Sequence, residues 1–140
     1  MGQKVHPYGI RLGYTKPWKA RWYSAKEYSK NLLEDLKIRK FLDKQLVNSG
    51  VSHVEIERSA KRIRIIIHTA RPGIVIGRRG SEIDRLRSAV ENYTESEIFI
   101  DIKEVKVPQT NAQLVAQAVA QQLERRVAFR RAMKKAVMLT

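Results

Sequence analysis

Residues 74–83 read Ile-Val-Ile-Gly-Arg-Arg-Gly-Ser-Glu-Ile, a Gly-x-x-Gly motif with two arginines at its centre. The two glycines allow backbone angles and a close approach that a Cβ atom would obstruct, so the chain can leave one helix and begin another within four residues. Backbone N–H groups of the turn and of the helix that starts near Ser81 would form an electropositive concavity suited to phosphate. The motif predicts an RNA-binding loop made of Gly77, Arg78, Arg79 and Gly80. The alternative is a plain tight turn between helices.

The segments around this motif predict an α+β fold. A helix is expected over residues 25–48, a two-stranded hairpin over residues 53–67, and a third strand over residues 98–105. A short apolar turn precedes the glycine loop, and a helix capped by Ser81 follows it. The expected order is therefore helix, strand, strand, helix, Gly-x-x-Gly, helix, strand, with a three-stranded sheet covered on one face by helices.

Several side-chain patterns support these elements. Ser24 and Glu27 have the spacing of a capping box at the start of the first helix. The hairpin turn is placed at residues 59–61, and Glu55 and Glu57 are expected to pair with arginines such as Arg62 or Arg64 across the hairpin. The apolar stripe of the first helix is assigned to Tyr28, Leu32, Leu36, Leu42 and Leu46.

A single long basic helix is predicted from Ala112 to about Lys135. Leu114, Val115, Ala118, Val119, Phe129, Met133 and Ala136 form its apolar side, which needs a partner. Its other side carries like charges at a spacing of four, and such crowding suggests an anion opposite them. These cations are Arg126, Arg130, Arg131, Lys134 and Lys135. A solvated charge face is the alternative. Because the helix ends at Thr140 without a glycine cap, the chain looks cut inside a second domain.

The first 24 residues form a basic arm, and no acidic residue occurs between Gly2 and Lys26. Trp18, Trp22 and Tyr23 could stack on bases or pack onto the domain behind them. The residues of this arm expected to contact RNA are Lys4, His6, Arg11, Lys16, Lys19 and Arg21. The predicted organisation is an extension at 1–24, a domain at 25–106, and the start of a further domain at 107–140.

Composition limits the function. The chain has 28 Lys and Arg against 14 Asp and Glu, a net charge of +14, which indicates a polyanionic partner. No apolar run approaches the roughly 18 residues that a membrane span needs, and a soluble intracellular protein is expected. There are no cysteines, and His6, His53 and His68 are too dispersed for metal-ligand spacing, so no metal, no cofactor and no small-molecule substrate are expected. No catalytic constellation is present.

The glycine motif and the order of elements resemble a type II KH domain, a bacterial RNA-binding module, over about residues 25–106. Residues 2–13, Gly-Gln-Lys-Val-His-Pro-Tyr-Gly-Ile-Arg-Leu-Gly, and residues 124–135, Glu-Arg-Arg-Val-Ala-Phe-Arg-Arg-Ala-Met-Lys-Lys, are similar to the family of the third protein of the bacterial small ribosomal subunit. That family continues into a second domain rich in glycine and arginine, which is missing here after its first helix.

The resemblance implies a cytoplasmic ribosomal protein in the head of the small subunit, with no catalysed reaction. Its implied partners are small-subunit rRNA, mRNA at the entry of the channel, and neighbouring small-subunit proteins. The basic cluster corresponding to Arg130, Arg131 and Lys134 faces incoming mRNA in that family. The resemblance leaves open a KH domain that serves as a protein-docking body.

Two other functions compete with this prediction. A free-standing KH regulator or a ribosome-assembly factor would use the same loop, but the long basic arm and the unfinished last helix are hard to explain in either. A nucleic-acid enzyme or a helix-turn-helix DNA-binding protein lacks support, because no catalytic acid cluster accompanies the helix pair around Gly77 and the turn lacks the usual apolar spacing.

Overall fold

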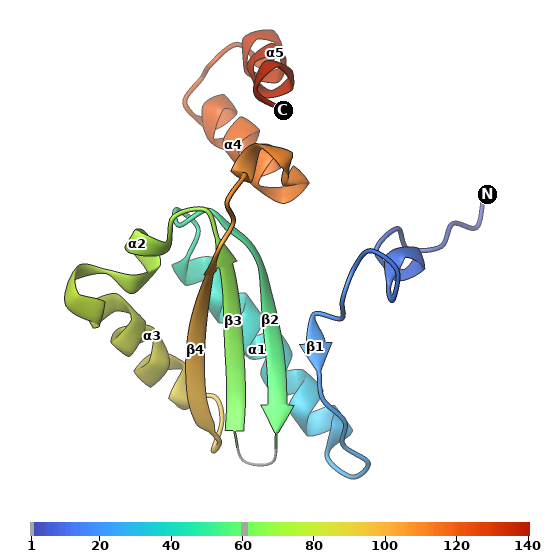
Figure 1. Ribbon diagram of the computed structural model, residues 1–140, viewed down its shortest axis with the longest axis vertical. Helices are drawn as coiled ribbons and strands as arrows, with labels where there is room; N and C mark the ends of the chain where they lie inside the picture. The colour runs from blue at the N-terminus through green and yellow to red at the C-terminus, as the bar shows by residue number, and fades with distance from the viewer. Residues whose placement is uncertain (1, 60–61) are drawn as a thin grey trace.

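A computed structural model describes residues 2–59 and 62–140 and shows a mixed sheet with helices on one side (Figure 1). Its elements are, in chain order, η1 (Gly9–Arg11), β1 (Ala20–Arg21), α1 (Tyr28–Gln45), β2 (Val51–Ser59), β3 (Arg62–Thr69), α2 (Pro72–Ile76), η2 (Arg78–Gly80), α3 (Ser81–Glu91), β4 (Glu97–Glu104), η3 (Pro108–Thr110), α4 (Ala112–Glu124) and α5 (Phe129–Leu139). The predicted α+β class and the order of elements around the glycine motif are confirmed.

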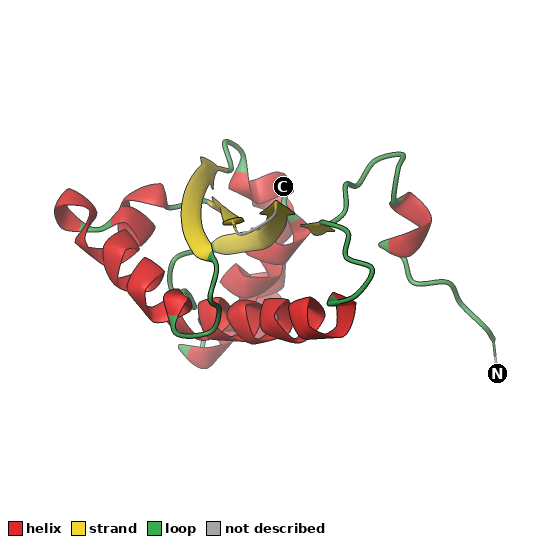
Figure 2. Cartoon of the chain, turned by 90° about the horizontal axis from the view of Figure 1, so that it is seen from below, coloured by secondary structure: helices red, strands yellow, loops and turns green. Residues whose placement is uncertain are grey.

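The sheet has the strand order β1-β2-β3-β4. β2 and β3 form an antiparallel hairpin, while β4 pairs in parallel with β3 after the chain has crossed through α2 and α3. The predicted turn at residues 59–61 includes Ala60 and Lys61, which lie outside the described residues. Figure 2 views the strands from one end and shows α1 running along one side of them.

The core lies between the sheet and these helices because strand side chains alternate in direction. On the inner face of β2, β3 and β4 most of the alternating residues are apolar and buried, and helices α1, α2 and α3 add side chains to the same cluster. The cluster consists of Ile38, Leu42, Leu46, Val54, Ile56, Ile63, Ile65, Ile67, Val75, Leu86, Val90, Ile98 and Ile100. The opposite face of the sheet is polar and carries charged residues from all three of these strands.

The sheet has four strands rather than the expected three. β1 belongs to the N-terminal arm and pairs in parallel with β2, with Ala20 opposite Ile56. Two residues are too few to show alternation in the sequence, so this strand gave no periodic signal. The arm is therefore partly built into the domain instead of extending freely along its whole length.

The buried stripe of α1 also differs from the prediction. Leu42 and Leu46 are buried as expected, but Tyr28, Leu32 and Leu36 are exposed. The face that meets the sheet instead includes Ile38 and, unexpectedly, the carboxylate of Asp35. The helix begins at Tyr28 with Glu27 as its N-cap, so the predicted capping box is wrong, although the Glu27 N–H does donate to Ser24 Oγ at 3.1 Å in the turn before the helix.

The predicted long helix is wrong, since two helices, α4 and α5, occupy that region. Arg126 has a positive φ of 60°; its N–H donates to Leu123 O, and the N–H of Val127 donates to Gln122 O. These two bonds form the Schellman arrangement that ends a helix, normally with glycine at the left-handed position. α5 packs back beside α4, burying Ala132, so Phe129 and Met133 are exposed rather than part of one continuous apolar face.

Within the described residues, no helix combines the length and the apolar character that a membrane crossing requires.

Candidate RNA-binding surfaces

The glycine loop connects α2 to α3 at one side of the sheet (Figure 1). Gly77 has φ 72° and ψ −175°, and Gly80 has φ 83° and ψ 4°. The first pair of angles is accessible essentially to glycine alone, and the second is the left-handed helical region that glycine also favours. Both glycines therefore have the conformational role that the sequence predicted for them.

Arg78 and Arg79 form the tip of this loop and are exposed. Arg79 has φ 54°, a left-handed conformation that is uncommon for residues other than glycine. Gly80 rather than Ser81 is the N-cap of α3, and no side chain caps the helix there. The expectation that Ser81 would cap is wrong, and the helix N-terminus is left available to an anion beside two cations.

A second basic surface lies on α5, beyond the end of the sheet from which β4 leads into α4 (Figure 1). The side chains of Arg130 and Lys134, and those of Arg131 and Lys135, are four residues apart and thus adjacent on the helix. A shallow depression is lined by Arg130, Arg131, Lys134, Lys135, Met138 and Leu139. Cationic walls around an apolar floor suit a nucleic-acid strand, which presents phosphates and flat base surfaces.

Arg126 does not belong to this row. It lies in the connection between α4 and α5, at the left-handed position of the Schellman turn. A spacing of four residues places the side chains of Arg126 and Arg130 next to each other only if both residues belong to one helix. Of the five predicted cations, the structure therefore brings four together.

The N-terminal arm is only partly free to contact RNA. Arg21 forms ion pairs with Glu55 and Glu57, each at 2.8 Å. The ammonium of Lys19 lies 4.9 Å from the centroid of the Tyr8 ring, and the His6 Nδ1 accepts a hydrogen bond from the Tyr8 N–H. The remaining predicted arm residues, which are all exposed, are Lys4, Arg11 and Lys16.

The aromatic residues of the arm divide between the two roles considered for them. Trp22 packs onto the domain, with its Nε1 donating to Asp35 at 2.8 Å and its ring 5.2 Å from that of Tyr28. Trp18 and Tyr23 are exposed and remain available for stacking. The packing interpretation therefore holds for one of the three residues.

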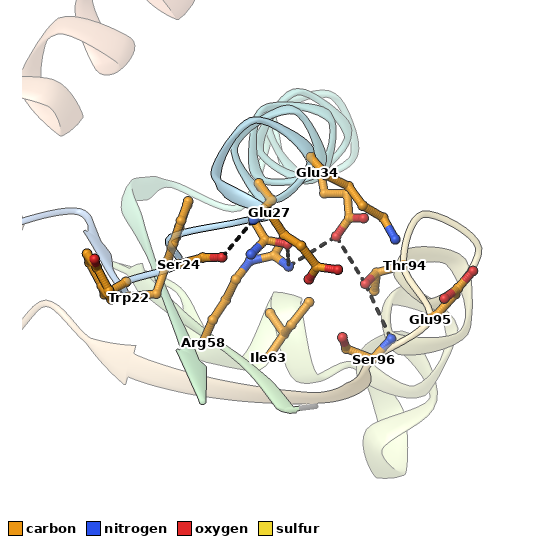
Figure 3. A pocket seen from close by; sticks show the side chains of 12 residues that line it. Trp22, Ser24, Glu27, Glu34, Arg58, Ile63, Thr94, Glu95 and Ser96 are labelled. Atoms are coloured by element: carbon orange, nitrogen blue, oxygen red, sulfur yellow. Dashed lines mark hydrogen bonds and ion pairs between the residues drawn. The ribbon is translucent and has the colours of Figure 1, made fainter. Parts of the chain in front are cut away.

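Trp22 borders a polar cavity between α1, β2 and the turn before β4 (Figure 3). Inside it, the Arg58 guanidinium donates to Glu34 at 3.0 Å and to Asp35 at 2.6 Å and 2.9 Å. The Thr94 hydroxyl donates to Glu34, so the charges of Arg58, Glu34 and Asp35 are paired within one network. We assign this network to stability, since it joins α1 to the sheet.

The acidic residues of β2 do not pair as expected. Glu55 and Glu57 bind Arg21 of the arm, whereas Arg62 pairs with Glu97 and Arg64 with Asp101 on β4. Cross-hairpin pairing was predicted without knowledge of β1, which brings Arg21 beside β2. Arg62 and Arg64 of β3 therefore form their ion pairs with β4 rather than with β2.

The histidines are also closer than their spacing suggested. His53 and His68 are directly opposite each other in the β2–β3 hairpin, and their rings stack at 4.1 Å between centroids. Glu55 lies on the same face, and one ligand atom from each of the three residues lies within 4.8 Å of the others. The judgement that the histidines are too dispersed for a metal site is thus wrong for this pair, because only the hairpin register could have revealed the cluster.

Comparison with known proteins shows which family the chain belongs to. The model of the KH domain matches residues 37–110. The chain is 58% identical over 137 residues to small ribosomal subunit protein uS3 of Koribacter versatilis, covering 98% of this chain and 61% of that protein.

Two further relatives have the same name. The uS3 protein of Geobacter sulfurreducens is 57% identical, with 98% of this chain and 65% of the relative covered. That of Geobacter sp. strain M21 is 56% identical, with 100% and 66% covered. The chain therefore spans between 61% and 66% of the length of these relatives. The KH match over half of the chain and the identity over almost all of it show that the chain belongs to the KH-domain family and, within it, to the uS3 family of small-subunit ribosomal proteins.

Proposed function

We propose that this chain is a structural constituent of the small ribosomal subunit in the cytoplasm, with no catalysed reaction. In this role it binds small-subunit rRNA, contacts neighbouring small-subunit proteins and lines the entry of the mRNA channel. The name shared by its relatives supports the ribosomal part of the proposal. The RNA contacts are argued from the chain's own surfaces.

The observation that carries the proposal is the cluster of four cations on α5. Arg130, Arg131, Lys134 and Lys135 are exposed, and none of them forms an ion pair with an acidic residue in the described part of the chain. Four adjacent like charges repel one another, so they destabilise the free protein slightly and are neutralised when a polyanion binds. We assign this face to mRNA, which passes as a single strand.

The glycine loop is assigned to rRNA. Arg78 and Arg79 stand beside the uncapped N-terminus of α3, so full charges and backbone N–H groups can act on one phosphate group. Two acidic residues, Glu82 and Asp84, lie in the first turn of that helix, and Arg85 pairs with Glu82 at 3.1 Å. Because these carboxylates repel phosphate groups, we expect RNA to contact the tip of the loop rather than the length of α3.

The exposed cations of the arm, Lys4, Arg11 and Lys16, extend the rRNA contact. The Arg11 guanidinium donates to the Pro7 carbonyl, which holds the arm in a turn around η1. Arg21 is excluded from the proposed rRNA contacts because Glu55 and Glu57 already neutralise it. His6, whose Nδ1 accepts a hydrogen bond from the Tyr8 N–H, is kept as a neighbour of the contact.

Photo-crosslinking in purified small subunits tests this assignment. Subunits carrying the full-length gene product would be bound to mRNA containing 4-thiouridine downstream of the decoding site, and cross-linked peptides would be identified by mass spectrometry. We expect mRNA on the α5 peptide and rRNA on the peptides of the loop and the arm. The exposed lysines of α1, Lys37, Lys40 and Lys44, serve as the internal control. Cross-links to α1 in preference to α5 would contradict the proposal.

A further inference from the structure

The polar face of the β2–β3 hairpin holds a cluster that the RNA-binding role does not use. His53 and His68 face each other across the hairpin, and Glu55 follows His53 by two residues on the same face. Paired strands position their side chains better than a loop would, and β2 and β3 are paired from His53 opposite His68 to Ser59 opposite Arg62. The register of this pair places the three groups on one face of the sheet.

The distances fit a small coordination sphere. His53 Nε2 lies 3.4 Å and His68 Nε2 lies 3.5 Å from Glu55 Oε1. Metal bonds of about 2.0–2.2 Å at tetrahedral angles separate neighbouring ligand atoms by about 3.4 Å. Both nitrogen–oxygen distances are close to this value, and the three ligand atoms all lie within 4.8 Å of one another. The two rings are stacked with 14° between their planes, so one imidazole has to turn for both nitrogen lone pairs to meet at one ion.

A buried polar atom without a partner points into the cluster. His68 Nε2 has almost no solvent contact and no hydrogen-bond partner among the described residues. Leaving such an atom unsatisfied lowers stability, and each case in a folded protein calls for an explanation such as an ion. A ligand at this nitrogen would remove that cost.

The groups around the cluster orient its ligands. Arg21 holds the other oxygen, Oε2, of Glu55 at 2.8 Å, which leaves Oε1 directed at the two imidazoles. Ser52 Oγ lies 3.1 Å from His53 Nδ1 and also accepts a hydrogen bond from Asn111 Nδ2 at 2.7 Å. When His53 Nδ1 carries the proton and donates to Ser52, Nε2 has a free lone pair, the arrangement usual for metal-bound histidines.

We propose that His53, His68 and Glu55 form a binding site for one divalent transition-metal ion, of which Zn²⁺ is the best match. Two imidazoles and one carboxylate suit Zn²⁺, Co²⁺ or Ni²⁺, whereas Mg²⁺ and Ca²⁺ prefer oxygen ligands alone. Solvent water completes the coordination, since the His53 side chain is 31% exposed.

Some charged groups near the site oppose the binding of a cation, and others favour it. Burial, and next the neighbouring imidazole, lowers the pKa of His53, while burial lowers the pKa of His68, so both rings are neutral and able to bind a metal at pH 7. Lys19 and Lys103 lie near enough to oppose a bound cation, as does Arg21, whereas Glu57 offsets part of this charge. The site is therefore expected to bind metal less tightly than a closed structural zinc site.

Calorimetric titration of the untagged chain with Zn²⁺, after removal of bound metal with EDTA, tests the proposal. We expect one ion per chain and the appearance of tetrahedral absorption bands when Co²⁺ is used instead. His53→Gln and His68→Gln should each weaken binding by more than about a hundredfold, beyond the 10–100-fold typical for a group outside the ligand set. The matched control is His6→Gln, in the exposed arm, which should bind as the unmodified chain does.

A second measurement does not depend on whether the variants fold. In the unmodified chain labelled with ¹⁵N, Zn²⁺ should shift the Nε2 resonances of His53 and His68 and leave those of His6 in place. The proposal would be overturned if the unmodified chain did not bind Zn²⁺, if either substituted chain bound it as tightly as the unmodified chain, or if only the His6 resonances shifted.

Discussion

At the scale of single residues, Gly77 controls the shape of the proposed rRNA loop. Its φ of 72° with ψ near 180° is a conformation of glycine, and a Cβ atom there would lie 2.5 Å from Glu82 Cγ and 2.8 Å from Glu82 Cβ. Gly77→Ala should therefore lower the free energy of unfolding by about 1–3 kcal/mol and weaken RNA binding as the loop shifts. Denaturant unfolding and fluorescence anisotropy with a labelled RNA would measure both effects.

Gly73→Ala is the matched control for this substitution. Gly73 lies inside α2, and its φ is not positive. A Cβ atom added at this position would meet no other part of the protein within 4 Å. Alanine is the better helix former, so stability should stay unchanged or rise by up to about 1 kcal/mol. Equal losses in the two variants would show that the Gly77 conformation has no special role.

Asp35 is the buried charge that joins α1 to the arm and the sheet. It is 2% exposed and binds the Trp22 indole and the Arg58 guanidinium. Asp35→Ala would leave Arg58 buried with Glu34 as its remaining ion-pair partner (Figure 3), and removal of one member of a buried pair costs about 3–5 kcal/mol. We expect about 3 kcal/mol, the lower end, because Glu34 stays.

The control for Asp35 is Asp43→Ala, an exposed carboxylate on the same helix. Surface substitutions of this kind usually change stability by less than about 0.5 kcal/mol. Thermal and denaturant unfolding of both variants would separate the two cases. Similar small losses would mean that the Asp35 network contributes little to stability.

At the scale of elements, the glycine loop should act through its charges. Arg78→Asp with Arg79→Asp should reduce RNA affinity at least about tenfold, because each charge-assisted hydrogen bond contributes about 1.5–3 kcal/mol. Folding should be unaffected, since both side chains are exposed and Asp tolerates the left-handed conformation of Arg79. Lys37→Asp with Lys44→Asp on α1 changes the net charge equally and should lose less affinity.

The cations of α5 should be visible in the salt dependence of RNA binding. Arg130, Arg131 and Lys134 replaced by Ala should lower the slope of log affinity against log salt by about 0.7 for each phosphate group of a single strand that the variant no longer neutralises. The same slope is measured for Lys37, Lys40 and Lys44 replaced by Ala, which removes an equal charge from α1. An unaltered slope in the α5 variant would favour a solvated charge face.

Elements with strong periodicity were predictable from the sequence. The alternation of Ile63, Ile65 and Ile67 places every second residue of a strand in the core, and the structure has that strand, β3. The loop glycines were also predictable, because few other residues adopt the angles found at Gly77 and Gly80. Local signals of this kind do not depend on the rest of the fold.

Other features depended on contacts distant in sequence. The break after α4 places an arginine, Arg126, at the left-handed position, so neither Gly nor Pro marked it. The pairing of Ala20 with Ile56 and that of His53 with His68 follow from strand register, which composition does not reveal. For the same reason the sequence did not predict the ion pairs of Glu55 or the proposed metal ligands His53, His68 and Glu55. The cations of α5 were predicted because they are neighbours in sequence.

At the scale of the whole molecule, the chain carries a net charge of +14, and half of its 14 acidic residues form ion pairs with arginines of the described part of the chain. The loop between α2 and α3, which contains Arg78 and Arg79, lies at one side of the fold, and α5 lies beyond the end of the sheet (Figure 1). Separate basic surfaces suit a protein held between RNA segments rather than one that binds a single short site.

Sedimentation is the most direct test of the ribosomal role. The tagged protein, expressed from its full-length gene, would be run through a sucrose gradient at high salt, with rRNA quantified in every fraction. The account predicts stable migration with mature small subunits, in amounts that follow small-subunit rRNA. Recovery as free protein, or only in transient precursor complexes, would contradict it and favour a KH regulator or an assembly factor.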